Sequence, residues 1–145
     1  AGPQNIAFAS QWDNYPQAIN ASVPHDAAAN ASAVWILVAG STNPMQTLLP
    51  NAQLRFRYDD NTTEQLDLTP PLNFWGLCPY GGTDYDYSKD SFCLPEHPPV
   101  TVQLGNNHRA VAYAWALKHG AVLRAVELEV LSLEVVIGIL AVTLM

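Results

Sequence analysis

The sequence has little charge, and most of what it has is acidic. Only 13% of the 145 residues are charged, about half the usual share. Six Lys and Arg oppose thirteen Asp and Glu, which gives a formal net charge of −7. A nucleic-acid partner is excluded, because binding to a phosphate backbone depends on clustered basic side chains. An anionic membrane surface is disfavoured for the same reason.

Long apolar segments and targeting signals are also scarce. The start, AGPQNIAFAS, lacks the basic flank and apolar core of a signal peptide. The longest apolar stretch, VVIGILAVTLM at 135–145, has about eleven residues, too few to cross a bilayer as a helix. We therefore expect no membrane span, and we interpret 1–145 as a single domain from a larger secreted protein.

Catalytic and cofactor motifs are not apparent. The four histidines (His25, His97, His108 and His119) are isolated from one another. None accompanies a Gly-x-Ser-x-Gly elbow or a nucleophilic cysteine. We expect no cofactor and no catalytic residue. An enzyme of the glycosidase type, with its acid and base drawn from Asp84, Asp86 and Asp90, remains the alternative.

Short β-branched and alternating segments dominate what is present. The pattern predicts strands over 5–10, 18–23, 33–40, 53–58, 64–68, 100–104, 108–117, 122–131 and 135–144. The Ala-rich stretch 23–32 is expected to be a loop. Eight or nine short strands with turns at regular spacing are typical of an all-β, two-sheet sandwich, of which the jelly roll is one form.

The clearest local signal is a hairpin. In QLRFRY and EQLDL apolar residues alternate with polar ones, and DDNTT lies between the two segments. This indicates one buried and one wet face. The segment VLRAVELEVLSLEVV contains several Leu and Glu residues, which favour helix, so a helix is the alternative. Its Val-Glu-Leu-Glu-Val alternation favours a strand.

The two cysteines, Cys78 and Cys93, bracket the segment PYGGTDYDYSKDSF. An isolated pair in a loop-rich context favours a disulfide, which would stabilise the fold by roughly 3 kcal/mol in the chain-entropy model. Two buried free thiols are the alternative. A zinc site is excluded because two thiols lack the further ligands that tetrahedral zinc needs.

Three Asn-x-Ser/Thr patterns occur, at Asn20, Asn30 and Asn61. Each lies in or beside an expected loop, and Asn61 falls at the tip of the hairpin. These patterns predict N-glycosylation, with chance occurrence in a bacterial protein as the alternative. Together with the cysteine pair they predict an extracellular location.

Aromatic and acidic side chains gather in the cysteine-bracketed segment. Tyr and Trp rings stack on sugars and anchor protein interfaces, and acids accept hydroxyl hydrogen bonds. The expected ligand-binding residues are Trp75, Tyr80, Asp84, Tyr85, Asp86 and Tyr87. A calcium site at Asp84–Asp90 is a weaker reading, because the spacing matches no EF-hand. Trp35 and Trp115, inside strands, are expected in the core.

The motifs QWDNYP, LVAGSTNPMQ, FWGLCPYGGTDYDY and EVVIGILAVTL resemble β-sandwich domains of uncharacterised secreted proteins associated with glycoside hydrolases. The resemblance implies a non-catalytic, carbohydrate-associated accessory domain. A structural or adhesive extracellular subunit, associating with neighbouring chains through its C-terminal strand, is the second reading. In either case the expected partner is a carbohydrate or a neighbouring protein domain.

Overall fold

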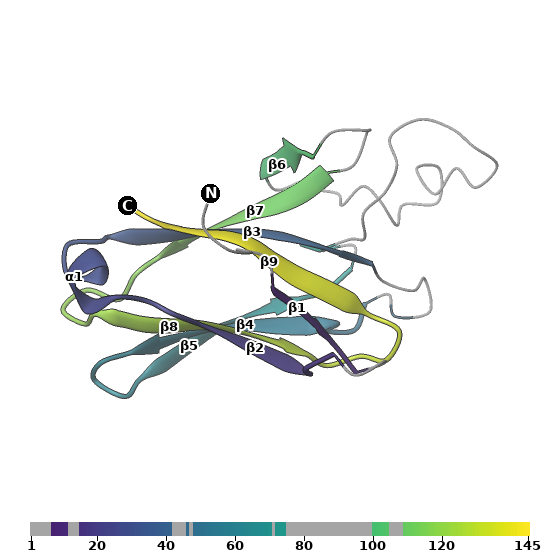
Figure 1. The fold of residues 1–145 in the computed structure, drawn as a ribbon, viewed down its shortest axis with the longest axis horizontal. Helices are drawn as coiled ribbons and strands as arrows, with labels where there is room; N and C mark the ends of the chain where they lie inside the picture. The colour runs from purple at the N-terminus through teal and green to yellow at the C-terminus, as the bar shows by residue number, and fades with distance from the viewer. Residues whose placement is uncertain are drawn as a thin grey trace.

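The structure, a computed structural model, describes residues 7–11, 15–41, 46, 48–70, 72–74, 100–104 and 109–145. These residues form two antiparallel sheets that stack as two layers (Figure 1). The strands are β1 (Ala7–Ser10), β2 (Ala18–Ser22), β3 (Ala33–Ser41), β4 (Ala52–Tyr58), β5 (Thr63–Leu68), β6 (Val100–Gln103), β7 (Arg109–Ala116), β8 (Leu123–Val130) and β9 (Val136–Leu144). One short helix, α1 (His25–Ala28), lies at one end of the sandwich.

The strand order is that of a jelly roll. One sheet has the order β1-β9-β3-β7-β6 and the other has β2-β8-β4-β5. The pairs β1:β9, β2:β8, β3:β7 and β4:β5 are nested in sequence, as in a long hairpin rolled up on itself. Pairing of β9 with β3 and of β8 with β4 closes the roll. β6 adds one edge strand beyond the eight of the standard jelly roll.

The core lies between the two sheets and follows from period-two alternation. In β3, Val34, Ile36 and Val38 have no exposed surface, and in β4 Leu54 and Phe56 have none either. Alternate residues of each strand point to the opposite face, so these positions line the inner surface. The inner residues of β7, β8 and β9 complete the same cluster.

These elements confirm the all-β two-sheet sandwich, and all nine expected strands are present within a few residues of their predicted bounds. The helical alternative for the segment beginning at Val122 is wrong, because this segment forms β8 and the turn that leads to β9. The one local difference is α1, a single helical turn inside the expected loop 23–32. Its alanines favour helix, which explains the difference.

The final strand, β9, lies inside its sheet between β1 and β3 rather than at an open edge. Its first half, residues 136–139, pairs on one side with β1, while the whole strand pairs with β3 on the other. Among the described residues, no helix has the length and apolar character needed to span a bilayer.

Candidate functional site

The expected ligand-binding segment lies outside the described residues. This applies to Trp75, Tyr80, Asp84, Tyr85, Asp86 and Tyr87, to the suggested calcium ligands, and to the cysteines Cys78 and Cys93. The disulfide and the binding surface therefore stay predictions from the sequence. The remaining candidate sites come from the two outer faces of the sandwich and from its sides.

The three glycosylation-pattern asparagines are described, and all are exposed. Asn61 lies in the β4–β5 turn with a positive φ of 64°, a conformation that Asn tolerates better than other non-glycine residues. Asn30 follows α1. Asn20 lies on β2 and donates a hydrogen bond from its side-chain amide to Glu127 at 3.4 Å. The hydroxyl residues that complete the three patterns, Ser22, Ser32 and Thr63, are exposed as well.

The outer face of the four-stranded sheet is polar and internally paired. Arg55 forms an ion pair with Glu129, and Arg57 forms one with Glu127 at 2.9 Å. Both pairs join β4 to β8 diagonally, because the residue directly opposite Arg55 is Glu127 and the residue directly opposite Arg57 is Ala125. Because the guanidinium groups of Arg55 and Arg57 each contact a carboxylate, their positive charges are balanced by the negative charges of Glu129 and Glu127 on the same face.

Hydrogen bonds extend the same polar network to β5. The side-chain amide of Gln53 donates to Asp67 at 2.6 Å, and Arg55 donates through Nε to the side-chain oxygen Oε1 of Gln53 at 2.7 Å. The two arginines of β4 and their carboxylate partners are thus engaged with one another, and the described members of this face include no aromatic ring. The face has the character of a solvated surface.

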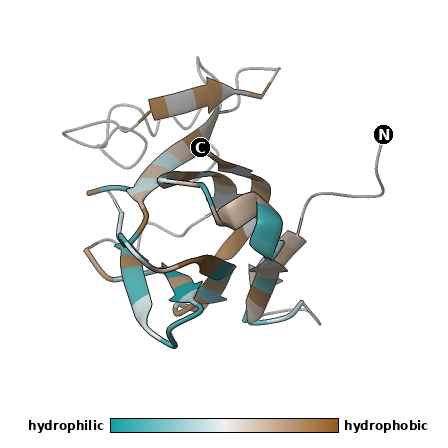
Figure 2. Ribbon diagram, turned by 90° about the vertical axis from the view of Figure 1, so that its left-hand side faces the viewer, coloured by the Kyte–Doolittle hydropathy of each residue, from teal (hydrophilic) through white to brown (hydrophobic). Residues whose placement is uncertain are grey.

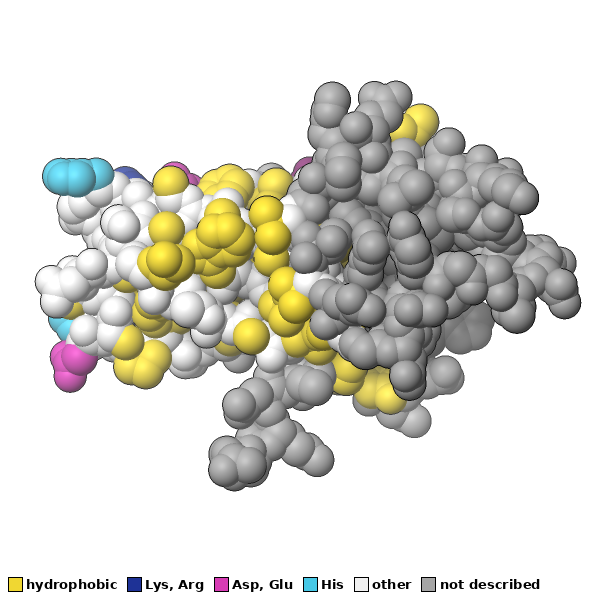
Figure 3. Space-filling model, turned by 90° about the horizontal axis from the view of Figure 1, so that it is seen from above, with side chains coloured by type: hydrophobic (Ala, Val, Ile, Leu, Met, Phe, Trp, Pro, Cys, Tyr) yellow, Lys and Arg dark blue, Asp and Glu magenta, His cyan; other side chains and the backbone are white. Residues whose placement is uncertain are grey.

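The outer face of the five-stranded sheet has a different character. Its described side chains, taken from the residues that alternate with the buried ones, include no charged group. We call this set the uncharged face: Phe8, Ala33, Trp35, Leu37, Ser41, Val100, Val102, Ala112, Ala114, Ala116, Val136, Leu140, Ala141 and Thr143. Figure 3 looks down on it and shows hydrophobic side chains along the middle with charged ones near the margins.

The contrast between the two faces is visible along the strands. Figure 2 shows hydrophilic segments mainly in the lower, four-stranded sheet, and largely hydrophobic strands in the upper one. Phe8, Val100 and Val102 of the uncharged face are 41%, 58% and 41% exposed. Phe8 lies on one edge strand, and Val100 and Val102 lie on the other, so exposed apolar side chains occur at both edges of this face. Large exposed apolar surfaces mark interaction sites in soluble proteins.

Trp35 belongs to the uncharged face, so the expectation that it is a core residue is wrong. Its neighbours Val34 and Ile36 point inward with no exposed surface, which directs Trp35 outward. It is half-buried, with Ala114 on β7 and Thr143 on β9 directly opposite it. The sequence could not reveal this, because every residue from Ala33 to Ala39 is apolar and no polar position marks the outer face.

Trp115, by contrast, packs against the core as expected. Its ring stacks on Phe56 with centroids 4.8 Å apart, and its indole N–H donates to Glu64 at 3.0 Å. Tyr58 donates its hydroxyl to the same carboxylate oxygen at 2.6 Å. These hydrogen bonds, that from Tyr58 first, hold the pKa of Glu64 below its ordinary value, while burial raises the pKa of Tyr58 to about 12.

Glu64 was missed by the sequence reading. In EQLDL, Leu66 and Leu68 face inward, so Glu64 shares their face. The pattern that could have indicated an inward Glu64 is its position two and four residues before the inward-facing Leu66 and Leu68, on the same face of the strand. Its carboxylate accepts hydrogen bonds from Tyr58 in its own sheet and from Trp115 in the other sheet. The carboxylate therefore connects the two sheets and has a structural role.

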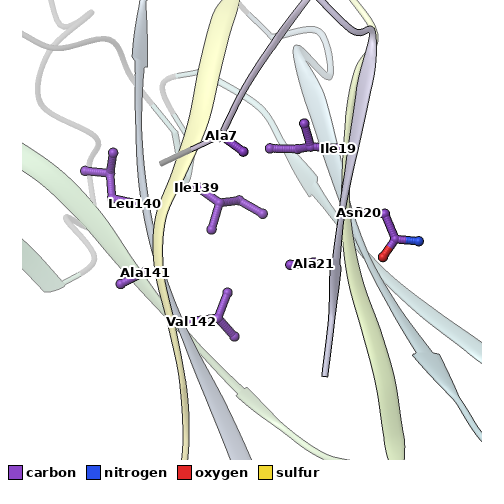
Figure 4. A pocket seen from close by; sticks show the side chains of 8 residues that line it. All are labelled: Ala7, Ile19, Asn20, Ala21, Ile139, Leu140, Ala141 and Val142. Carbon is purple, nitrogen blue, oxygen red and sulfur yellow. The ribbon is translucent and has the colours of Figure 1, made fainter. Parts of the chain in front are cut away.

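A third feature is an apolar slot on one side of the sandwich. It has a volume of about 340 Å³ and lies between β9 and β2, next to the point where β1 begins. Figure 4 shows Ala7, Ile19, Ala21, Ile139 and Val142 around the opening, with Asn20 directed away from it. The sheets are not closed by side chains here, so the core reaches the surface.

A further hollow, about 410 Å³ in volume, lies where α1 meets the β7–β8 turn. Lys118 is among its lining residues, but its ammonium is already bound by Asp60 at 2.5 Å and by Thr62 at 3.0 Å. The ammonium of Lys118 is therefore engaged within the fold, and Ser32 and His119 are the other polar side chains of the lining.

Comparison with known proteins found no match: no family model, no curated protein and no solved structure matches the chain.

Proposed function

We propose that this chain is a non-catalytic interaction domain that packs the uncharged face of its five-stranded sheet against a neighbouring protein surface. The observation that carries the proposal is the asymmetry of the sandwich. One outer face is a paired polar lattice, and the other offers apolar and small side chains without charge. An antiparallel sheet with one solvated face normally alternates polar residues on that face, and the five-stranded sheet does not.

The described carboxylates support a non-catalytic role, because the ones that could work in pairs are engaged in the fold. Glu127 and Glu129 are paired with arginines. Glu64 accepts hydrogen bonds from Tyr58 and Trp115, and Asp60 is bound by Lys118. A glycosidase needs one free base and one acid of raised pKa, whereas the pKa values of Glu64 and Asp60 are both lowered.

The nature of the uncharged face favours a protein partner over a sugar. A sugar site combines an aromatic ring with several hydrogen-bonding groups. Around Trp35 the described polar side chain on the face is Thr143, Ser41 is the other polar member, and the rest are alanine, valine, leucine and phenylalanine. An apolar protein surface satisfies such a face without hydrogen bonds. A carbohydrate-associated role stays a proposal that rests on the segment from Trp75 to Tyr87.

An extracellular setting, also a proposal, fits the same surface. The patterns at Asn20, Asn30 and Asn61 lie on β2, after α1 and in the β4–β5 turn. None of the three belongs to the uncharged face. Glycans at these positions would cover the polar side and the ends of the sandwich, and they would leave the uncharged face open for a partner.

Site-specific photo-crosslinking tests the proposal. A photo-reactive phenylalanine analogue replaces Ala114, an exposed residue of the uncharged face, in the protein expressed in its source cells. The matched control places the same analogue at Gln65, an exposed residue of the polar face. We expect a discrete crosslinked protein from position 114 and none from position 65.

The opposite pattern would contradict the proposal. Crosslinks to protein from position 65 but not from 114 would move the contact to the polar face. Retention of the chain on insoluble polysaccharide, abolished by Tyr85→Ala with Tyr87→Ala and unaffected by Ala114→Lys, would favour the carbohydrate role instead.

A further inference from the structure

The exposed large hydrophobic side chains of the described residues gather on two surfaces of the sandwich. Four of them are members of the uncharged face. Leu104 follows β6, Met145 lies beside the start of β3, and the described residues of the polar face include none. The remaining six lie in the connections at the end of the sandwich away from α1, and we call them the leucine end: Tyr15, Leu48, Leu49, Leu72, Leu131 and Leu133.

The strand registers bring these connections together. The last residues of β1 and β3, Ser10 and Ser41, both pair with Val136, the first residue of β9. Ala52, the first residue of β4, pairs with the end of β5 and with Val130, the last residue of β8. The β1–β2, β3–β4 and β8–β9 connections and the start of the β5–β6 connection therefore share one end, and α1 lies at the other (Figure 1).

A buried amide holds two of these connections against each other. The side chain of Asn51, which has no exposed surface, donates to the carbonyl oxygens of Gln46 at 2.8 Å and Leu49 at 2.9 Å. The carbonyl oxygen of Asn51 accepts from the backbone N–H of Leu131 at 2.9 Å. The β3–β4 connection is thus bonded to the β8–β9 turn, and the leucines of both are carried on a hydrogen-bonded backbone.

Leu48 is exposed at this end in spite of an unfavourable backbone conformation. Its φ is 61°, a left-handed value that is unusual for a bulky side chain. Its N–H donates to the carbonyl oxygen of Pro70 at 2.7 Å, and the residue is 66% exposed. Strained residues of this kind persist where the surrounding structure holds them, and they cluster at functional sites. An exposed leucine held in this way is a candidate contact residue.

The β8–β9 turn joins the leucine end to the uncharged face. Leu131 and Leu133 are exposed in the turn, and Val136, with which β9 begins, is an exposed member of the face. Glu134 is the charged residue among the described residues of the four connections. Apolar side chains are therefore exposed on both sides of the point where the five-stranded sheet ends.

We propose that one partner contacts both surfaces: a folded protein domain whose uncharged, apolar surface bends around the end of the five-stranded sheet. This inference rests on the proposed function and adds a second surface to it. A sheet face and the ends of its strands point in different directions, so a flat bilayer can cover only one of the two, whereas an angled protein surface can cover both. The hydrogen-bonded leucine end suits such a partner, because a preorganised surface loses little freedom on binding.

Crosslinking from the leucine end tests whether the partner is shared. The photo-reactive phenylalanine analogue replaces Leu133, and the matched control places it at Ala27, an exposed residue of α1 at the opposite end. We expect position 133 to give a crosslinked product of the same mass as the product from position 114, and position 27 to give none.

The other outcomes of this experiment overturn the inference. A product from position 114 alone would remove the leucine end from the contact and leave the proposed function standing. A product from position 133 alone, or one of different mass from that at position 114, would show that the two surfaces do not share a partner. No product from either position would contradict the proposed function as well.

The substitution Leu133→Asp tests whether the leucine end contributes to binding. In the chain that carries the analogue at position 114, we expect Leu133→Asp to lower the yield of crosslinked product at least fivefold. The matched control Ala27→Asp adds the same charge at the other end of the sandwich and should leave the yield unchanged. Circular dichroism melting establishes that both variants are folded.

An unchanged yield in Leu133→Asp would overturn the proposal. A lipid surface is the other occupant that this experiment distinguishes. If the chain sediments with phosphatidylcholine vesicles and Leu133→Asp abolishes this binding, the leucine end contacts lipid and the shared protein contact is overturned.

Discussion

Trp115 and Glu64 join the two sheets through the 3.0 Å hydrogen bond from the indole N–H to the carboxylate. Trp115 comes from β7 in the five-stranded sheet, and Glu64 comes from β5 at the edge of the four-stranded one. The same carboxylate oxygen accepts from Tyr58, whose hydroxyl also accepts from the backbone N–H of Lys118 at 3.2 Å. A single inward acid therefore satisfies two aromatic donors at the boundary of the core.

Replacing Glu64 by Ala should destabilise the protein by about 2 to 3 kcal/mol, because two charge-assisted hydrogen bonds are lost and both donors stay behind. The matched control is Gln65→Ala, next in the chain but exposed on the outer face, for which we expect a change within about 0.5 kcal/mol. Urea unfolding measures both. Equal effects of the two substitutions would show that Glu64 does not tie the sheets together.

The same carboxylate makes stability depend on pH. The pKa of Glu64 is lowered in the folded protein from the ordinary 4.5, chiefly by the hydrogen bond from Tyr58. A folded pKa below the unfolded one means that the contribution is fully present above the unfolded value. It is lost as the pH falls below about 4.5 and through the folded pKa.

Glu64→Gln should therefore show a flatter fall in unfolding free energy than wild type between about pH 5 and 3. Asp60 titrates in the same direction, because its hydrogen bond from Lys118 lowers its pKa to about 2. The variant Asp60→Asn separates the two groups. A Glu64→Gln curve parallel to that of wild type would assign the acid sensitivity elsewhere.

A side chain added at Gly40 would meet backbone atoms, whereas one added at Gly138 would first meet a side chain. A Cβ on Gly40 would lie 2.5 Å from the backbone carbonyl oxygen of Val136, whereas one on Gly138 would first meet the ring of Phe8, also at 2.5 Å. Backbone cannot move without disturbing the β3–β9 ladder, but the ring of Phe8, 41% exposed, can turn away.

We expect Gly40→Ala to cost about 2 to 3 kcal/mol as an overpacked site, and Gly138→Ala to cost less and to increase the exposure of Phe8. Thermal melting ranks the two variants. A larger loss for Gly138→Ala would mean that Phe8 is held more rigidly than its exposure indicates.

Alternation and turn chemistry made most of the fold predictable. The strands β4 and β5 around the Asp-Asp-Asn-Thr-Thr turn, and the Val-Glu-Leu-Glu-Val run of β8, were readable because a single inner face imposes period two on them. Their assembly into a jelly roll was only one possibility, since strand order depends on contacts between segments far apart in the chain.

The functional surface was less predictable for the same reason. The sequence predicts a core position for Trp35 because β3 is apolar on both faces. An apolar sequence does not distinguish the face that points into the core from the face that points outward. The slot lies between β9 and β2, which belong to different sheets, and a local pattern does not reveal how two strands of different sheets are placed. The segment from Trp75 to Phe92, which the sequence favoured, lies outside the described residues.

Asn61 is the glycosylation-pattern residue whose surroundings make the sharpest prediction. It is exposed in the β4–β5 turn with a positive φ of 64°, and the hydroxyl residue that completes its pattern is Thr63, the exposed first residue of β5. Thr62, between them, is fixed by its hydrogen bonds to Asp60, from the backbone N–H at 2.9 Å and from the hydroxyl at 2.6 Å. The turn thus projects Asn61 beyond both strands.

Secreted from a eukaryotic host, the chain should carry a glycan on Asn61, and Thr63→Val should remove it while leaving the β4–β5 ladder intact. The comparison site is Asn20, which lies on a strand and is bonded to Glu127, so we expect lower occupancy there. Peptide mapping by mass spectrometry reads both sites. An unmodified Asn61 beside a fully modified Asn20 would show that strand geometry does not limit the reaction, and that accessibility at the turn does not decide it.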